Sequence, residues 1–253
     1  MANLSLPRIL CLHGGGVNAR VFELQCRAII ARLGAQFRFV FVDGPFPCQP
    51  HPAILAVYGE MGPFYRWLRW LPDQSAAAND EAAAALIREQ VLGGMRADRG
   101  TGPWVGVLGF SQGAKIAASL LWAQQRVRAL GLGAPLTDFR FGVLMAGSPP
   151  VVNLDPRLPH TAGTTTAARL AFDFDDWPER NVGDHVVHAQ TLHVHGLRDP
   201  DVDRHRQFMR LYFRGGTVRV VEWDGDHRLP IKTVDVEAIA QEIEDMADES
   251  QFA

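Results

Sequence analysis

Short apolar runs alternate with amphipathic stretches along the first part of the chain. Residues 8–13 form an apolar run that ends at three glycines, and residues 37–43 form another that ends at a Gly-Pro pair. Each run predicts a buried strand followed by a turn. Between them, Asn18 is a candidate helix cap, because apolar residues at helical spacing follow it: Val21, Leu24, Ala28, Ile29 and Leu33. This part of the chain therefore predicts a strand-helix-strand unit.

The alternation continues to residue 222. Asn79 is a plausible cap for an alanine-rich helix that extends to Met95, and residues 104–110 predict a strand that leads into a helix at 114–123. Three further apolar runs predict strands at 141–146, 191–195 and 218–222. Strands that alternate with helices favour a mainly parallel sheet covered by helices on both faces.

Two segments interrupt this alternation. Residues 44–78 are rich in proline and contain an aromatic cluster at 64–70, so we expect a long ordered loop rather than a regular element. Residues 149–190 begin with two prolines and predict an insertion near the edge of the sheet. We see no internal repeat, and we expect residues 1–253 to form a single domain.

Composition and charge exclude several classes of protein. Hydrophobic residues make up 47% of the chain and charged residues 21%, which is typical of a globular protein. With 25 basic and 28 acidic residues, the net charge of −3 gives no reason to expect nucleic acid as a partner. The three cysteines form no C-x-x-C pair, which argues against a disulfide framework or a zinc site. Without a signal sequence or an apolar run of membrane-spanning length, we expect a cytoplasmic protein that does not bind membranes.

The chemistry of the chain is expected to centre on the sequence Gly-Phe-Ser-Gln-Gly at residues 109–113, a G-x-S-x-G pattern. Chance alone would place this pattern in roughly one chain in ten of this length. Here it lies between a predicted strand and a predicted helix, as the nucleophile elbow of the α/β-hydrolase fold requires. In that elbow the serine lies in a strained turn that points its hydroxyl out of the sheet. We therefore expect an α/β-hydrolase fold with Ser111 as the nucleophile.

A serine nucleophile needs a base and an acid that orients the base. In this fold the acid and then the histidine follow the serine in the sequence, each on a loop after a later strand. Asp199 follows the strand predicted at 191–195, and His227 follows the strand predicted at 218–222. The order predicts a catalytic triad of Ser111, Asp199 and His227.

Two other acids compete with Asp199 for the role. Asp201 lies on the same loop, and Asp226 adjoins the histidine. We prefer Asp199 because it is nearest the end of the strand, whereas Asp201 could cap the helix that begins near Asp203. A lone loop histidine is ordinarily a surface residue, and it is the position of His227 after the last strand that favours catalysis.

The glycine loop after the first strand is a candidate oxyanion site. His13-Gly14-Gly15-Gly16 lies where this fold places a flexible loop that supplies one backbone N–H, while the residue after the nucleophile supplies the other. We expect these donors to be Gln112 and Gly15, with Gly16 as the alternative. We expect His13 to orient the loop. Without the elbow, an ordinary glycine turn would be the preferred interpretation.

Two other groups of residues are candidates for binding. His193 and His195 alternate on a predicted strand and could share a face, but no third ligand stands at a convincing spacing, so we expect no metal. Phe64, Tyr65 and Trp67 are candidate substrate-binding residues, because an apolar loop beside a hydrolase site could hold an acyl chain. Packing within the loop is the alternative for these aromatic side chains.

Five blocks of the chain carry a resemblance that is more specific than the elbow alone. They lie at residues 10–16, 39–45, 62–67, 106–113 and 191–200. Together they resemble the fungal family of small serine hydrolases known as FSH, from about residue 8 to residue 230. This resemblance implies the same nucleophile, acid and base as the order of the motifs, and a reaction that needs no cofactor.

Residues 53–67 resemble most closely the family members that serve fungal polyketide pathways. That resemblance implies an acyl thioester as the substrate and an acyl carrier domain of a polyketide synthase as a partner. Arg66 and Arg69 could meet an acidic carrier surface, or they could be ordinary solvated charges. A carboxylesterase acting on oxygen esters of a small metabolite would use the same residues. A non-catalytic binding protein could keep the scaffold, although the intact order of the triad opposes this alternative.

Overall fold

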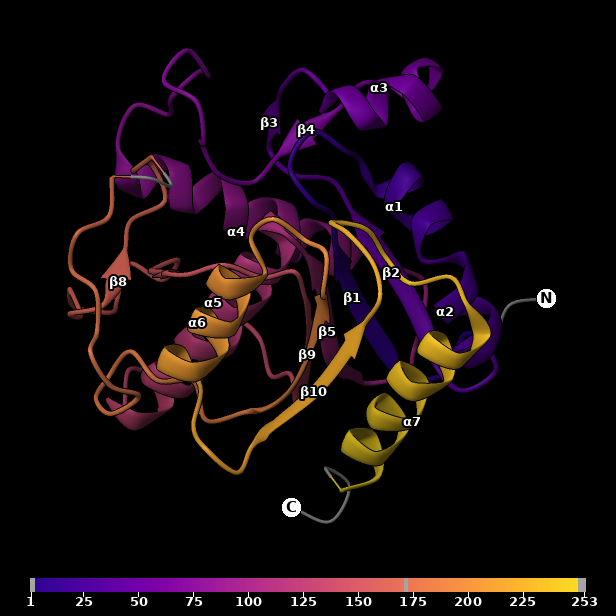
Figure 1. Cartoon of the computed structure of the whole chain (residues 1–253). Helices are drawn as coiled ribbons and strands as arrows, with labels where there is room; N and C mark the ends of the chain where they lie inside the picture. Colours follow the sequence, from indigo (N-terminus) through magenta and orange to yellow (C-terminus); the bar gives the residue numbers. More distant parts are fainter. Residues whose placement is uncertain (1–2, 171–172, 250–253) are drawn as a thin grey trace.

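A six-stranded sheet forms the centre of the protein, for which a computed structural model describes residues 3–170 and 173–249 (Figure 1). The strand order is β10-β9-β6-β5-β1-β2, and every neighbouring pair is parallel. The strands are β1 (Arg8–Leu12), β2 (Arg38–Val42), β5 (Trp104–Phe110), β6 (Phe141–Met145), β9 (Gln190–Gly196) and β10 (Val218–Trp223). The predicted parallel sheet is confirmed.

Helices cover both faces of this sheet (Figure 1). One face packs against α4 (Asp80–Ala97), α5 (Gln112–Ala129) and α6 (Val202–Tyr212). The other face packs against α1 (Ala19–Gln25), α2 (Arg27–Leu33) and α7 (Thr233–Glu249). In the part of the chain that the structure describes, no helix combines the length and the apolar character that crossing a bilayer requires.

The alternation of side chains along each strand divides the apolar residues into two cores. Leu10 and Leu12 of β1 are fully buried in the core that contains α4 and α5, whereas Ile9 and Cys11 are buried in the core that contains α1, α2 and α7. Successive strand residues point to opposite faces. The continuous apolar run of each strand therefore reflects a sheet that is buried on both sides.

Two asparagines cap helices as the sequence predicts. Asn18 Oδ1 accepts a hydrogen bond from the backbone N–H of Val21 at 2.8 Å, and Asn79 caps α4 in the same way. The single helix expected after Asn18 is wrong, however, because the chain breaks at Cys26 into α1 and α2. The break lets Ile29 of the second helix reach the core, while Leu24 lies 42% exposed.

The segment 44–78 is ordered, but the expectation that it lacks regular elements is wrong. It contains β3 (Phe46–Pro47), α3 (Pro52–Tyr58), the 3₁₀ turn η1 (Gly59–Met61) and β4 (Tyr65–Arg66). The strands β3 and β4 pair antiparallel. The helix α3 begins with a proline at its first position, where the missing N–H needs no partner, and His51 Nδ1 accepts from the backbone N–H of Ala53.

The segment 149–190 packs on α5, over one face of the sheet, rather than near the edge of the sheet as the sequence predicts. It connects β6 to β9, two neighbours within the sheet, and contains the short parallel pair β7 (Val151–Val152) and β8 (Thr164–Thr165). The backbone N–H of Val152 donates to Ser119 Oγ of α5 at 2.8 Å. The segment therefore packs against the helix that follows the nucleophile elbow.

Candidate active site

Ser111 lies in a strained turn between β5 and α5. Its backbone angles are φ 54° and ψ −114°, and a positive φ is uncommon for a residue other than glycine. The backbone N–H of Ser111 donates to the carbonyl of Met145 at 2.8 Å, which ties the turn to the end of β6. The strand-turn-helix context that the G-x-S-x-G pattern predicts is therefore present.

The two glycines of the pattern allow the strand and the helix to cross closely. A Cβ atom added to Gly113 would lie 1.9 Å from the carbonyl oxygen of Leu12, and one added to Gly109 would lie 2.2 Å from the carbonyl oxygen of Gly113. Both obstacles are backbone atoms that no side-chain rotation can move. The elbow therefore requires glycine at both positions.

We expect Gly113→Ala to lower the free energy of unfolding by roughly 3 kcal/mol or more, because the new methyl group overlaps backbone atoms of β1. Gly93→Ala is the matched control, since it lies inside α4 with open space around its added Cβ. That change should be neutral or stabilise by up to about 1 kcal/mol. Urea unfolding of both variants measures the difference, and equal stabilities would contradict the close crossing.

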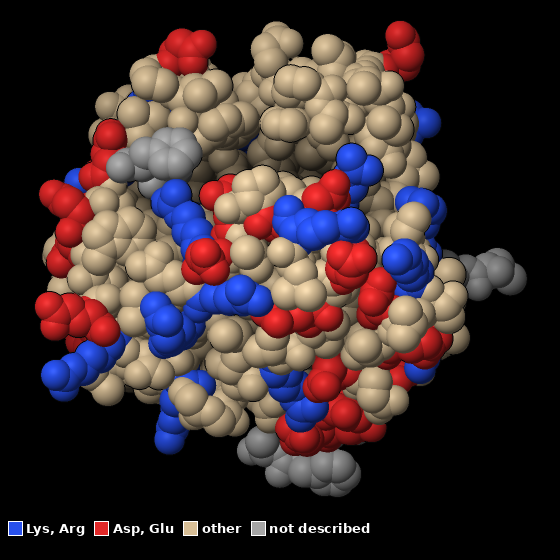
Figure 2. Space-filling model, in the orientation of Figure 1, with Lys and Arg blue, Asp and Glu red and all other residues tan. Residues whose placement is uncertain are grey.

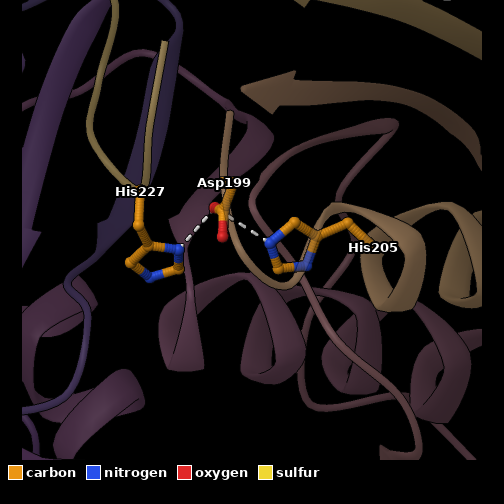
Figure 3. Close-up of side chains that lie close together, drawn as sticks. All are labelled: Asp199, His205 and His227. Carbon is orange, nitrogen blue, oxygen red and sulfur yellow. Dashed lines mark hydrogen bonds and ion pairs between the residues drawn. The ribbon is translucent and has the colours of Figure 1, made fainter. Parts of the chain in front are cut away.

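Asp199 and His227 meet at the carboxyl ends of β9 and β10 (Figure 3). Nδ1 of His227 lies 2.6 Å from Oδ2 of Asp199. A carboxylate can only accept, so Nδ1 carries the proton. The second ring nitrogen, Nε2, points away from Asp199 with a free lone pair (Figure 3). His227 is thus held in the tautomer that a general base needs.

The rival acids lie elsewhere. Asp201 is exposed and occupies the N-cap position of α6, although its side chain makes no capping hydrogen bond. The carboxylate of Asp226 lies 3.4 Å from Nε of Arg228. Among the described residues, Asp199 is the one acid of these three that contacts His227.

Among the described residues, His227 contacts the elbow through Phe110, and no hydrogen bond joins it to Ser111. The ring of His227 packs against that of Phe110, the residue before Ser111, with centroids 5.0 Å apart. Within the described ranges the Ser111 hydroxyl donates no hydrogen bond, and such contacts are often long in enzymes without substrate. The side chain of His227 is 40% exposed. Figure 2 shows a hollow above the loops that follow β9 and β10, with uncharged residues along most of its upper rim.

The carboxylate of Asp199 is held in its ionised form. Burial raises the pKa of Asp199, but hydrogen bonds from His205, from His227 and from the backbone N–H of Asp201 together hold this pKa well below its ordinary range. The acid therefore stays negatively charged at any pH at which the protein would function, as an orienting carboxylate must.

Two backbone donors are open among the described residues of the glycine loop and the elbow. Gly15 lies against the side chain of Gln112, and in the described structure the backbone N–H of neither residue has an acceptor. Gln112 is the first residue of α5, where the helix dipole also favours negative charge. The alternative donor, Gly16, already donates to the carbonyl of Tyr65 at 2.9 Å. The geometry thus favours Gly15 over Gly16.

His13 orients the glycine loop, in agreement with the expected role. Its Nδ1 donates to the carbonyl of Gly14 at 2.6 Å, and its Nε2 accepts from the backbone N–H of Gly44 at 2.8 Å. Burial lowers the pKa of His13 to about 4, so the ring is neutral and has no free lone pair. The carbonyl of His13 in turn accepts from the indole of Trp67 at 2.9 Å.

The aromatic residues Phe64 and Trp67 of the 64–70 cluster are buried next to the site. Trp67 is 0% exposed and Phe64 is 7% exposed, so neither presents a surface to a substrate. This corrects their assignment as substrate-binding residues. Tyr65 is half-buried in β4 and stays a prediction. The side chain of Gln112 accepts from the backbone N–H of Trp67 at 3.1 Å, which joins this loop to the elbow.

Sequence reasoning missed two buried residues beside the site. Nε2 of His205 lies 3.1 Å from Oδ2 of Asp199. A signal existed, because His205, Phe208 and Tyr212 fall on one face of a helix. Lys115, one turn after Ser111, donates to the carbonyl of Pro149 at 2.9 Å, and burial lowers its pKa to about 7.

Two groups of residues that contain histidine are candidate metal ligands. His193 and His195 are buried with ring centroids 6.1 Å apart, and the described residues supply no third ligand to them. Asp199, His205 and His227 offer atoms within 4.8 Å of one another. Two ligands on one tetrahedral zinc lie roughly 3.3 Å apart, whereas Oδ2 of Asp199 is 2.6 Å from His227 and faces two N–H groups. We assign this second group to hydrogen bonding.

Known proteins resemble this chain over nearly its whole length. "Esterase citA" of Monascus ruber is 45% identical over 247 residues, which cover 96% of this chain and 93% of the relative. "Probable esterase tazC" of Aspergillus terreus is 45% identical over 251 residues, with coverage of 96% and 93%. Both matches therefore span almost the full length of the two proteins compared.

Solved structures and a family comparison extend this result. The acyl-protein thioesterase 2 of Zea mays shares the fold with a TM-score of 0.52 at 15% identity, and the match covers 96% of this chain and 94% of that one. The family described as serine hydrolase (FSH1) matches residues 1–239. The sequence match, the curated relatives and the serine at the elbow lead to one conclusion, that the chain belongs to the FSH1 serine hydrolase family.

Proposed function

We propose that the protein hydrolyses an acyl thioester or ester through a covalent acyl-Ser111 intermediate. His227 is the general base and general acid, and Asp199 orients it. One observation carries the proposal: the strained serine of the elbow directly follows Phe110, whose ring packs against that of His227, and Nδ1 of His227 is bound to a buried carboxylate. Membership of a serine hydrolase family and the esterase names of the curated relatives support ester hydrolysis as the reaction.

The reaction consists of two acyl transfers. Oγ of Ser111 forms a bond to the carbonyl carbon while its proton passes to Nε2 of His227. The tetrahedral intermediate then expels a thiol or an alcohol, which takes that proton. Water attacks the acyl-enzyme in the second step, again losing a proton to His227, and the carboxylic acid leaves as the Ser111 hydroxyl is restored.

Two backbone N–H groups stabilise the negative charge that develops on the substrate oxygen. We assign these donors to Gln112 and Gly15, whose N–H groups have no other acceptor among the residues described. A donor of this kind contributes roughly 3 kcal/mol to the stabilisation of the transition state. The chemistry needs no cofactor.

We further propose that the acyl group is a polyketide chain carried as a thioester on a synthase carrier domain. The resemblance of residues 53–67 to members that serve such pathways supports this substrate, and the largely uncharged rim in Figure 2 is compatible with an apolar chain. Arg66 does not serve carrier docking, because it is buried, lies 4.7 Å over the ring of Phe46 and donates to Ser75. The cytoplasm is the proposed location, since all three cysteines are free.

A carboxylesterase acting on oxygen esters is the second candidate. The names of the relatives citA and tazC favour it, because both are called esterases. The same residues would perform both reactions, and the two candidates differ in the leaving group alone.

Hydrolysis of matched substrates separates these two functions. We expect N-acetylcysteamine thioesters to show a higher kcat/KM than oxygen esters of the same acyl chains, with the ratio measured across several chain lengths. A strong preference for oxygen esters would contradict the thioester proposal and support the second candidate. If folded protein hydrolysed neither series and Ser111 did not react with a fluorophosphonate probe, catalysis itself would be refuted.

A further inference from the structure

A second buried histidine contacts the carboxylate that we assign as the catalytic acid. His205 lies on α6 and is 2% exposed. Its Nε2 is 3.1 Å from Oδ2 of Asp199, and its Nδ1 is 2.9 Å from the carbonyl oxygen of Gly147. Figure 3 shows Asp199 between the rings of His205 and His227. The acid is therefore shared by two imidazoles.

Both partners of His205 are hydrogen-bond acceptors. A neutral imidazole has one N–H and one lone pair, so it would turn a lone pair toward either the carboxylate or the carbonyl of Gly147. Each contact is a hydrogen bond when both ring nitrogens carry protons. The proton could otherwise belong to Asp199, but the three donors around Asp199 hold the pKa of its carboxyl well below the ordinary range despite its burial.

Of the stacked pair His195 and His205, we infer that His205 carries the positive charge. His195 stacks on it with centroids 6.2 Å apart, and burial, with His205 as the next cause, lowers the pKa of His195 to about 4. His195 therefore stays neutral. The other ionisable groups that act on these rings are His193 of β9, Glu222 of β10, Arg206 of α6, and Asp199 and His227 on the two loops. Asp201 binds Asp199 through its backbone N–H, and Lys115 and Arg204 repel each other.

We propose that His205 is a positioning residue, held as a doubly protonated imidazolium, which fixes the carboxylate of Asp199 and makes His227 a weaker base. The inference rests on the proposed function, because it assigns His227 as the base. The carboxylate is held on three sides: Oδ2 accepts from both imidazoles, and Oδ1 accepts from the backbone N–H of Asp201 at 3.0 Å. It cannot rotate away from His227 without losing at least one of these bonds.

The charge of His205 also affects the pH range in which the base works. The ring centroids of His205 and His227 are 5.9 Å apart. A positive charge at that distance opposes a second one on His227, so His227 stays neutral, and able to accept the proton of Ser111, down to a lower pH.

Nuclear magnetic resonance of the histidine rings tests the charge state without any substrate. With ¹⁵N-labelled histidine at pH 8, we expect both ring nitrogens of His205 to show the chemical shifts of protonated nitrogen. The signals are assigned by their loss in His205→Gln, or by their through-space contacts with Phe208 if that variant does not fold. A pattern with one protonated and one unprotonated nitrogen would overturn the proposal.

The pH dependence of kcat/KM tests the effect on the base. Glutamine at position 205 is uncharged, so in His205→Gln we expect the acidic limb of the profile to move to higher pH by about one unit. The loss of kcat/KM relative to the unaltered protein is then up to about tenfold larger at pH 5 than at pH 9. His185→Gln is the matched control. His185 is also a buried histidine, and its ring contacts the carbonyl oxygens of Arg180 and Leu211 rather than Asp199. Its acidic limb should not move.

An equal loss of activity at every pH, with an unmoved acidic limb, would show that His205 has a structural role alone and would overturn the proposal. Failure of the proposed function would be recognised separately. In that case Ser111 would not react with a fluorophosphonate probe in the unaltered protein, whereas the ring protonation of His205 is read without catalysis.

Discussion

Replacing Ser111 with alanine is expected to lower kcat for ester hydrolysis by roughly 10⁴-fold to 10⁶-fold and to abolish reaction with a fluorophosphonate probe. The reason is chemical: alanine has no atom that can form the acyl bond, and the oxyanion donors at Gln112 and Gly15 retain only the weak catalysis of water attack. Initial rates on an acyl thioester and gel-based probe labelling measure the two effects.

The fold should survive this substitution. The Ser111 hydroxyl makes no hydrogen bond to the residues described, and alanine meets the same backbone strain at φ 54° as serine does. We expect the free energy of unfolding to change by less than about 1 kcal/mol. Ser5→Ala is the control, because Ser5 lies near the start of the chain and its exposed hydroxyl donates to Asn3 Oδ1. Full activity in folded Ser111→Ala would show that another nucleophile operates.

The strands and the elbow could be predicted because their signals are local. An apolar run that ends at a glycine indicates a buried strand wherever it lies, and the order of Asp199 and His227 after later strands follows from the topology of the fold. The break at Cys26 has no such signal, since neither glycine nor proline marks it. The two helices bury different residues against the sheet, Val21 and Phe22 of α1 and Ile29 and Leu33 of α2.

The burial of Trp67 and the contact of His205 with Asp199 also depend on contacts between distant parts of the chain. Trp67 belongs to an aromatic cluster in a predicted loop, and only the fold shows that its indole is buried and bonded to the carbonyl of His13. His205 is one polar residue in a strongly polar helix, where a histidine ordinarily faces solvent. Its role depends on α6 starting directly after the loop of Asp199, which brings residue 205 back over the carboxylate. Helical spacing with Phe208 and Tyr212 indicates that His205 is buried, but it does not reveal the contact with Asp199.

Asp199→Asn is expected to lower kcat by roughly 10³-fold to 10⁴-fold, although the change replaces one atom. Oδ2 of Asp199 accepts from His227 and His205, and Oδ1 accepts from the backbone N–H of Asp201. An amide has one oxygen and one NH₂ group, so in either orientation a donor faces a donor. If the NH₂ group faces His227, the ring takes the opposite tautomer, its Nε2 carries the proton, and it cannot accept the proton of Ser111.

Two other aspartates provide matched controls for this result. Asp201→Asn keeps the backbone N–H that binds Asp199 and removes the charge of an exposed side chain, so we expect kcat to change by less than about twofold. Asp226→Asn weakens the contact with Arg228 and should have an equally small effect. The three variants compared at one saturating substrate concentration rank the acids. If Asp201→Asn or Asp226→Asn lost more activity than Asp199→Asn, the carboxylate bonded to His227 would not be the one that orients it during the reaction.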